Sequence, residues 1–126
     1  MSADWKTVAR QLGHGVQSNE IMLQLSTGRQ QRVFVEQDGV ALRIWSVILG
    51  PAATSELQDG RPLEYAWERN RLSDLVGFSL DSRSRLIGET WIPNGGMTRE
   101  LFALHLEELA RVCDWHELRL SGDDRY

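Results

Sequence analysis

The sequence predicts an α+β domain built on an antiparallel sheet, with helices packed on one face of that sheet. Two observations predict this class. Several stretches alternate apolar and polar residues with a period of two, which is typical of strands, and short turn sequences join them. Other stretches repeat apolar residues every three or four positions, as helices do, and they lie before, between and after the strands. The expected order is helix, three strands, helix, two strands, helix.

Length and composition are those of a single domain spanning residues 1–126. Apolar residues make up 41% of the chain and charged residues 25%, which are ordinary proportions for a soluble globular protein. A chain of this length can bury a hydrophobic core without cross-links. We therefore expect one domain with one core.

The N-terminal half contains one helical stretch and three strand-like stretches. Residues 3–17 form the helical one, because apolar side chains recur there at three- and four-residue steps. The three strands are expected over 20–26, 30–37 and 39–49. Asp38 and Gly39 lie between two alternating stretches, which is a strong hairpin signal because both residue types tolerate a positive φ. This half is expected to form a helix and a three-stranded meander.

The C-terminal half continues with a helix, a second hairpin and a long helix. Two prolines offer alternative starts for the middle helix, Pro51 and Pro62, because proline suits a first helical turn. The second hairpin is expected over 76–93. The last helix should begin near Thr98 and end at a glycine cap, Gly122. A sheet covered by helices on one side leaves its other face open to solvent or to a partner.

Charge and hydropathy exclude several functional classes. The net charge is −4 and the isoelectric point is about 5.3, which argues against a general nucleic-acid binder and a polybasic membrane anchor. The longest apolar stretch, WSVILG, is much shorter than a membrane span. The N-terminus lacks the apolar core of a signal peptide. The single cysteine fits a reducing compartment, so we expect a cytoplasmic protein without membrane contact.

A cluster of reactive residue types near the C-terminus raises the question of an enzyme. Cys113 and His116 are neighbours on a helix surface, a spacing at which histidine can activate a thiolate. Cys113 also continues the apolar stripe, where cysteine usually acts as a small hydrophobic residue. Asp114 and Glu117 are expected on a solvent-exposed helix face with Arg111. We favour the structural interpretation and keep a small Cys/His enzyme as an alternative.

Metal, cofactor and phosphate motifs are missing from the sequence. It contains neither CxxC nor HExxH, and Cys113 with His116 would supply only two ligands. It contains no glycine-rich phosphate loop and no G-x-S-x-G elbow. We therefore predict no catalytic, cofactor-binding or metal-binding residues, and a protein that is not an enzyme.

Aromatic residues are the remaining functional signal. Five tryptophans are many for a chain of this length, and tryptophan and tyrosine are favoured anchors in protein interfaces. A sheet with an open face and free edges can also take up an extended peptide. The candidate partner-binding or dimer surface consists of Trp45, Arg43, Phe34, Tyr65, Trp67 and Trp91.

Arginines near these aromatics leave a second alternative open. Arg32 and Arg43 lie on exposed strand positions close to Trp45, an arrangement that resembles a platform for single-stranded nucleic acid. A nucleic-acid-linked regulator would use these residues. The overall acidity favours a protein partner instead.

Two segments of the chain carry a family resemblance. RLIGETWIP, followed by GGMTRELFALHLEELARVCDWHELRLSGDD, resembles the C-terminal half of the YbjN and type III secretion (Tir) chaperone-like family. The matching positions are Arg85, Leu86, Gly88, Glu89, Trp91 and Pro93, then Ala110, Cys113, Asp114, Glu117, Leu120, Gly122 and Asp124. DWKTVARQL, RVFVEQDG and LRIWSVI also resemble the first helix and meander of that family.

The resemblance implies an α-β-β-β-α-β-β-α fold and a non-enzymatic domain that binds protein. Chaperones of this fold are small, acidic and cytoplasmic, commonly form homodimers, and hold an extended segment of an effector. By this analogy, residues 61–72 would contribute to a dimer. The resemblance names no partner, and leaves open a secretion chaperone or a regulatory role.

Overall fold

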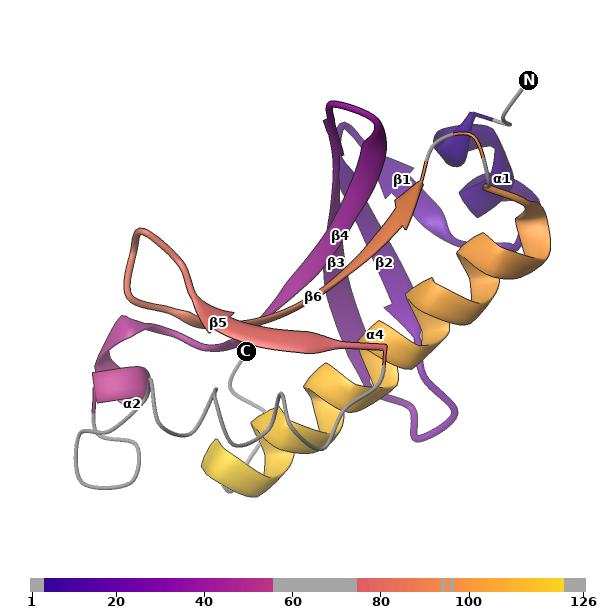
Figure 1. The fold of residues 1–126 in the computed structure, drawn as a ribbon. Helices are drawn as coiled ribbons and strands as arrows, with labels where there is room; N and C mark the ends of the chain where they lie inside the picture. Colours follow the sequence, from indigo (N-terminus) through magenta and orange to yellow (C-terminus); the bar gives the residue numbers. More distant parts are fainter. Residues whose placement is uncertain (1–3, 56–74, 94, 96, 122–126) are drawn as a thin grey trace.

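The computed structural model describes residues 4–55, 75–93, 95 and 97–121 (Figure 1). One sheet of six strands dominates this part of the chain, and its neighbouring strands are all antiparallel in the order β1-β2-β3-β4-β6-β5. The strands are β1 (Gly15–Gln17), β2 (Glu20–Gln24), β3 (Gln30–Asp38), β4 (Ala41–Leu49), β5 (Gly77–Leu80) and β6 (Leu86–Pro93). The helices are α1 (Trp5–Gln11), α2 (Pro51–Ser55) and α4 (Arg99–Ser121). The predicted α+β class is confirmed.

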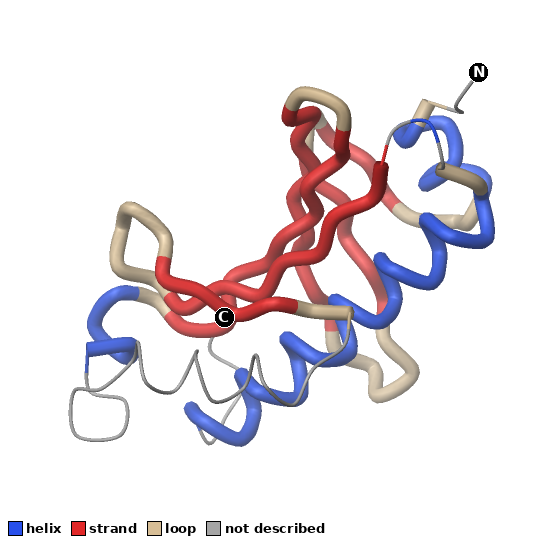
Figure 2. Tube along the Cα trace, in the orientation of Figure 1, coloured by secondary structure: helices blue, strands red, loops and turns tan. Residues whose placement is uncertain are grey.

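Helix α4 packs along one face of the sheet, where it contacts β3, β4 and β6 (Figure 2). Side chains at alternate strand positions point to this face and are buried, as the period of two predicts. Val33, Ile44 and Ile92 form the strand side of the core, and Phe102 and Leu106 form the helix side. A single hydrophobic core therefore lies between α4 and the sheet.

Helix α4 approaches the sheet closely at Gly88 in β6. A Cβ atom at this position would lie 2.6 Å from Sγ of Cys113, well inside the contact distance of real Cβ atoms. Cys113 is fully buried there. The predicted inward position of Cys113 is confirmed, and the glycine sets how closely helix and sheet can pack.

The predicted first helix is too long. Helix α1 ends at Gln11, and Gly13 has a φ of +90°, a conformation that ends a right-handed helix. Residues 15–17 then form strand β1, in which Val16 pairs with Ile21 of β2. The helical spacing of Val16 was coincidental, since its side chain reaches the same core from a strand. The sheet therefore has six strands instead of the predicted five.

The turns and helix starts agree with the sequence where the structure describes them. Gly39 has a φ of +61° in the hairpin between β3 and β4. Helix α2 begins at Pro51, one of the two predicted starts. Thr98 precedes α4, and its Oγ1 accepts a hydrogen bond from the Leu101 amide at 3.1 Å, an N-terminal cap. The alternative start at Pro62 and the cap at Gly122 lie outside the described residues.

Candidate partner-binding face

The sheet face opposite α4, here called the open face, carries four of the six predicted surface residues. Phe34 is paired with Trp45 across β3 and β4, and Arg43 is paired with Trp91 across β4 and β6. Pairing partners point to the same side of a sheet. The intervening Thr90 points the other way, because its Oγ1 lies 2.7 Å from Nδ1 of His105 on α4.

An aromatic pair occupies the middle of the open face. The rings of Phe34 and Trp45 stack with centroids 4.5 Å apart and planes inclined by 22°. Nε1 of Trp45 donates a hydrogen bond to Glu36 Oε1 at 2.8 Å. The guanidinium groups of Arg43 and Arg85 lie 5.2 and 5.6 Å from the Trp45 ring centroid, within cation–π range. These contacts hold both rings in fixed orientations.

An ionic network lies beside the aromatic pair. Arg43 donates from Nε to Glu89 Oε2 at 2.7 Å and from Nη1 to Glu36 Oε1 at 3.0 Å. The three residues come from neighbouring strands β3, β4 and β6. The Glu36 side chain is 47% exposed and those of Arg43 and Glu89 are 22% and 24% exposed, so solvent partly screens the network and its contribution to stability is modest. Its main effect is to fix the arginine and both carboxylates relative to Trp45.

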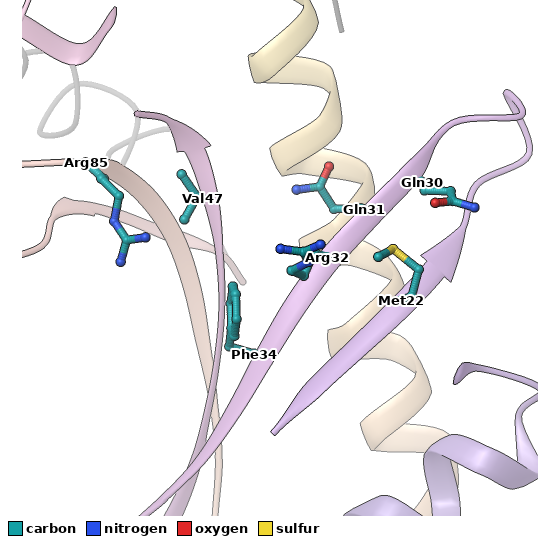
Figure 3. A pocket seen from close by; sticks show the side chains of 7 residues that line it. All are labelled: Met22, Gln30, Gln31, Arg32, Phe34, Val47 and Arg85. Carbon is teal, nitrogen blue, oxygen red and sulfur yellow. The ribbon is translucent and has the colours of Figure 1, made fainter. Parts of the chain in front are cut away.

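A pocket of about 380 Å³ lies next to Phe34 and is called the Phe34 pocket (Figure 3). Its lining residues come from β2, β3, β4 and the turn before β6: Met22, Gln30, Gln31, Arg32, Phe34, Val47 and Arg85. Arg85 is held by Asp81, whose Oδ2 accepts from its Nε at 2.7 Å. The neighbouring arginine and backbone amides also lower the pKa of Asp81, although burial opposes this shift.

A second hollow of about 300 Å³ adjoins the Phe34 pocket on β1 and β2. It is lined by Gly15, Val16, Gln17, Glu20, Met22 and Arg32. Met22 and Arg32 line both hollows, so the two meet at these side chains. Together they run across the strands, from the β1 edge towards β4.

Exposed apolar side chains mark the far end of the open face. Trp91, near the C-terminal end of β6, is 43% exposed. Val40, at the tip of the hairpin between β3 and β4, is 85% exposed. Among the described residues, these two are exposed large apolar side chains of this end of the sheet, and exposed apolar surface is typical of interaction sites.

The structure thus brings Phe34, Arg43, Trp45 and Trp91 onto one face, while Tyr65 and Trp67 lie outside the described residues. Sequence reasoning missed Met22, Val47 and Arg85, which complete the Phe34 pocket. Alternation within β2 and β4 placed Met22 and Val47 on the correct side. Only the pairing of strands shows that they approach Phe34.

The prediction that Asp114 and Glu117 are solvent-exposed is wrong. Asp114 is 7% exposed and Glu117 is fully buried. Arg29, in the turn between β2 and β3, donates to Asp114 Oδ1 at 2.6 Å and to Glu117 Oε1 at 3.2 Å. Arg111 instead pairs with Glu108 on the outer side of α4. The error arises because the β2–β3 turn reaches the C-terminal part of α4.

The environment of Cys113 does not support a nucleophile. Burial raises the pKa of its thiol, and the nearby Glu117 and Asp114 raise it further. The reactive form of cysteine is the thiolate, which this environment disfavours. The ring of His116 forms T-shaped contacts with Phe78 and Trp115, with ring centroids 5.0 and 4.7 Å apart. Cys113 is therefore a core residue in this fold.

In the part of the chain that the structure describes, His, Cys, Asp and Glu side chains form no group of three or more suited to holding a metal ion. None of the helices there is both long and apolar enough to cross a membrane.

The described part of the chain, with its six-stranded antiparallel sheet and long C-terminal helix, matches the fold of solved type III secretion chaperones. The structure of the ExsC–ExsE complex contains a chain with a TM-score of 0.62 and 16% identity, covering 95% of this chain and 97% of that one. The structure of the HopA1–SchA chaperone–effector complex contains a chain with a TM-score of 0.59 and 12% identity, covering 90% of this chain and 92% of that one.

A third solved structure agrees with these two. The type III secretion chaperone SycH of Yersinia pestis, in complex with a stable fragment of YscM2, matches with a TM-score of 0.53 and 12% identity, covering 86% of this chain and 92% of that chain. No protein-family profile matches the sequence, and no curated protein is significantly similar to it. At these low sequence identities, the similarity to the three solved structures shows a shared fold only.

Proposed function

We propose that this chain is a chaperone-like adaptor that holds a segment of a partner polypeptide on its open face. The observation that carries the proposal is the set of ordered yet accessible aromatic side chains there. Trp45 is fixed by Phe34, Glu36 and two arginines, and Trp91 is 43% exposed. Preorganised aromatic groups bind a partner with little loss of side-chain entropy.

The shared fold supports this proposal. The solved structures with the same fold include a chaperone–effector complex and a secretion chaperone bound to a fragment of another protein. Both were solved as complexes with a polypeptide partner. The proposal extends that mode of action to this chain and leaves the partner, and a secretion or YbjN-like regulatory role, to be identified.

The dimer and the location belong to the same proposal. Chaperones of this fold commonly form homodimers, and residues 61–72 are the segment expected to contribute by analogy. That segment lies outside the described residues. Sedimentation equilibrium of the purified chain should give twice the monomer mass if the proposal is correct. Fractionation of the native cells should place the protein in the cytoplasm.

The nucleic-acid alternative is less compatible with the open face. That alternative relies on Arg32, Arg43 and Trp45. Arg43 is already bound to Glu36 and Glu89. These carboxylates would face the phosphates of any nucleic acid that stacked on Trp45, and like charges repel at such distances. Protein segments, which offer amides and apolar side chains, fit this surface better.

Affinity capture from the native cytoplasm with a matched pair of variants tests the proposed function. Trp91→Ser removes an exposed side chain from the open face, and Leu104→Ser removes one that is 56% exposed on α4. Mass spectrometry should find a protein retained by the wild type and by Leu104→Ser and depleted with Trp91→Ser. A capture profile that is identical for both variants would contradict binding through the open face.

A further inference from the structure

We infer that the Phe34 pocket binds an apolar side chain of the partner segment that has a carboxylate next to it in sequence. This inference rests on the proposed function and adds the chemistry of the bound segment. The pocket offers about 380 Å³ of space, and Met22, Phe34 and Val47 provide its apolar surface. These three side chains come from adjacent strands, so one apolar group can contact all of them.

The charges that line the pocket determine which residue type should lie next to the apolar residue in the partner segment. Among the described residues that line it, the polar ones are two arginines and two glutamines, without a carboxylate. The lining thus presents two guanidinium groups and no carboxylate, on a protein with a net charge of −4, while Glu20 and Asp81 pair with these arginines from outside the lining. Complementary charge in the partner is therefore negative.

Arg32 is the cation best placed to meet a carboxylate. Its side chain is 59% exposed, and its Nε lies 3.5 Å from Glu20 Oε2, longer than a strong charge-assisted hydrogen bond. Arg85 is only 22% exposed and is held at 2.7 Å by Asp81. Arg85 thus serves as a fixed wall of the pocket, whereas Arg32 can turn towards an incoming acid.

The route of the bound segment follows from the second hollow. Because both hollows share Met22 and Arg32, their combined path crosses β2 and β3 instead of following one strand. A segment in this path lies over the face of the sheet. It does not extend the sheet by pairing with an edge strand, which is the other common way for a sheet to bind a peptide.

Nuclear magnetic resonance with the full ¹⁵N-labelled chain tests the inference. The probes are three capped pentapeptides that differ only in their central residues: Gly-Asp-Leu-Asp-Gly, Gly-Asn-Leu-Asn-Gly and Gly-Asp-Ala-Asp-Gly. The first should shift the amide resonances of Met22, Arg32, Phe34 and Val47. The asparagine peptide should bind about three- to fivefold more weakly because it lacks the charge, and the alanine peptide should bind more weakly because it leaves the pocket unfilled.

Two variants of equal charge change provide the control. Arg32→Gln should abolish the preference for the aspartate peptide over the asparagine peptide. Arg83→Gln should keep it, because Arg83 is an exposed residue of the nearby turn and does not line the pocket. Equal affinity of the wild type for both peptides would overturn the inference.

The outcomes separate this inference from the proposed function. Shifts confined to the outer edges of β1 or β5 would overturn the cross-strand route and leave partner binding intact. If no peptide binds while a partner captured by the wild type survives Arg32→Gln, the pocket inference fails and the proposed function stands. If neither peptide nor partner binds, both fail.

Discussion

The two faces of the sheet carry ionic clusters of the same composition, one arginine and two carboxylates, in opposite settings. On the α4 side, Arg29 meets Asp114 and Glu117, and the side chains are 16%, 10% and 0% exposed. On the open face, Arg43 meets Glu36 and Glu89 at more exposed positions. The first cluster joins a turn to a helix, and the second orders a surface. Burial therefore decides whether such a cluster mainly stabilises the fold or mainly orients side chains on a surface.

Removing the cation of the buried cluster should have the largest effect. In Arg29→Met, Asp114 and Glu117 lose the arginine that compensates their charge, and breaking a buried pair from one side costs about 3–5 kcal/mol. Urea denaturation should show this loss in the free energy of unfolding. The control is Arg111→Met, whose arginine is 64% exposed and pairs with Glu108, and its effect should stay under about 0.5 kcal/mol. Similar losses of unfolding free energy in both variants would contradict the conclusion that burial makes the Arg29 cluster more stabilising.

Filling the contact between β6 and α4 should have the next largest effect. Gly88→Ala places a methyl group 2.6 Å from Cys113 Sγ, and overpacking of this kind costs about 1–3 kcal/mol. Gly15→Ala is the matched control, because that strand glycine has open space around its Cβ position. Thermal denaturation measures both variants.

A double variant checks the cause of the Gly88 effect. If the clash with sulfur is responsible, Gly88→Ala combined with Cys113→Ala should lose less stability than the two single variants added together. Strict additivity would show that the cost arises elsewhere.

Acid should destabilise the fold through two histidines whose rings are partly or fully buried. Burial lowers the pKa of His105, and burial also lowers that of His14 against an opposing effect of Glu107. The unfolded chain then binds more protons than the folded chain just below about pH 6.5, so stability is complete only well above about pH 6.5, falls as the pH drops below that value, and levels off once the pH is below the lowered pKa values. Urea midpoints between pH 7.5 and 5 should decrease.

The histidine responsible can be identified by substitution. His105→Asn should flatten the decrease, since it removes a titrating ring from the contact with Thr90. An unchanged slope would assign the effect to other groups.

Breaking the exposed cluster should have the smallest effect on stability. Glu89→Gln leaves a hydrogen-bond acceptor for Arg43 and removes a charge that is 24% exposed, so the free energy of unfolding should change by at most about 1 kcal/mol. Binding of the partner identified by affinity capture should nevertheless weaken, because a neutral amide holds Arg43 less firmly beside Trp45 than a carboxylate does. A stability loss as large as that of Arg29→Met would remove the distinction between the faces.

Alternation along each strand explains why much of the open face was predictable. Because successive side chains of a strand point to opposite sides, the sequence alone placed Phe34 on the opposite face of the sheet from Val35, and Trp45 on the opposite face from Ile44. The hairpin at Gly39 and the start of α2 at Pro51 follow from conformational preferences of those residue types. Such signals are local and need no knowledge of the rest of the fold.

Features that depend on distant parts of the chain could not be predicted. Strand β1 has three residues, too few for a periodic signal, and is defined by its pairing with β2. The partner of Asp114 is Arg29, 85 residues earlier, and no local spacing indicates such a pair. The Phe34 pocket likewise depends on which strands are neighbours.

The long reach of the Arg29 contact has a consequence for how the protein forms during synthesis. The meander emerges from the ribosome well before α4, whose carboxylates complete the contact with the β2–β3 turn. Until then the inner side of the early strands has no helix to cover it. Contacts between distant segments also slow folding, because a long loop must close before they form. A chain cut short before Asp114 should therefore remain sensitive to protease, and the native form should appear only after the last helix has left the ribosome.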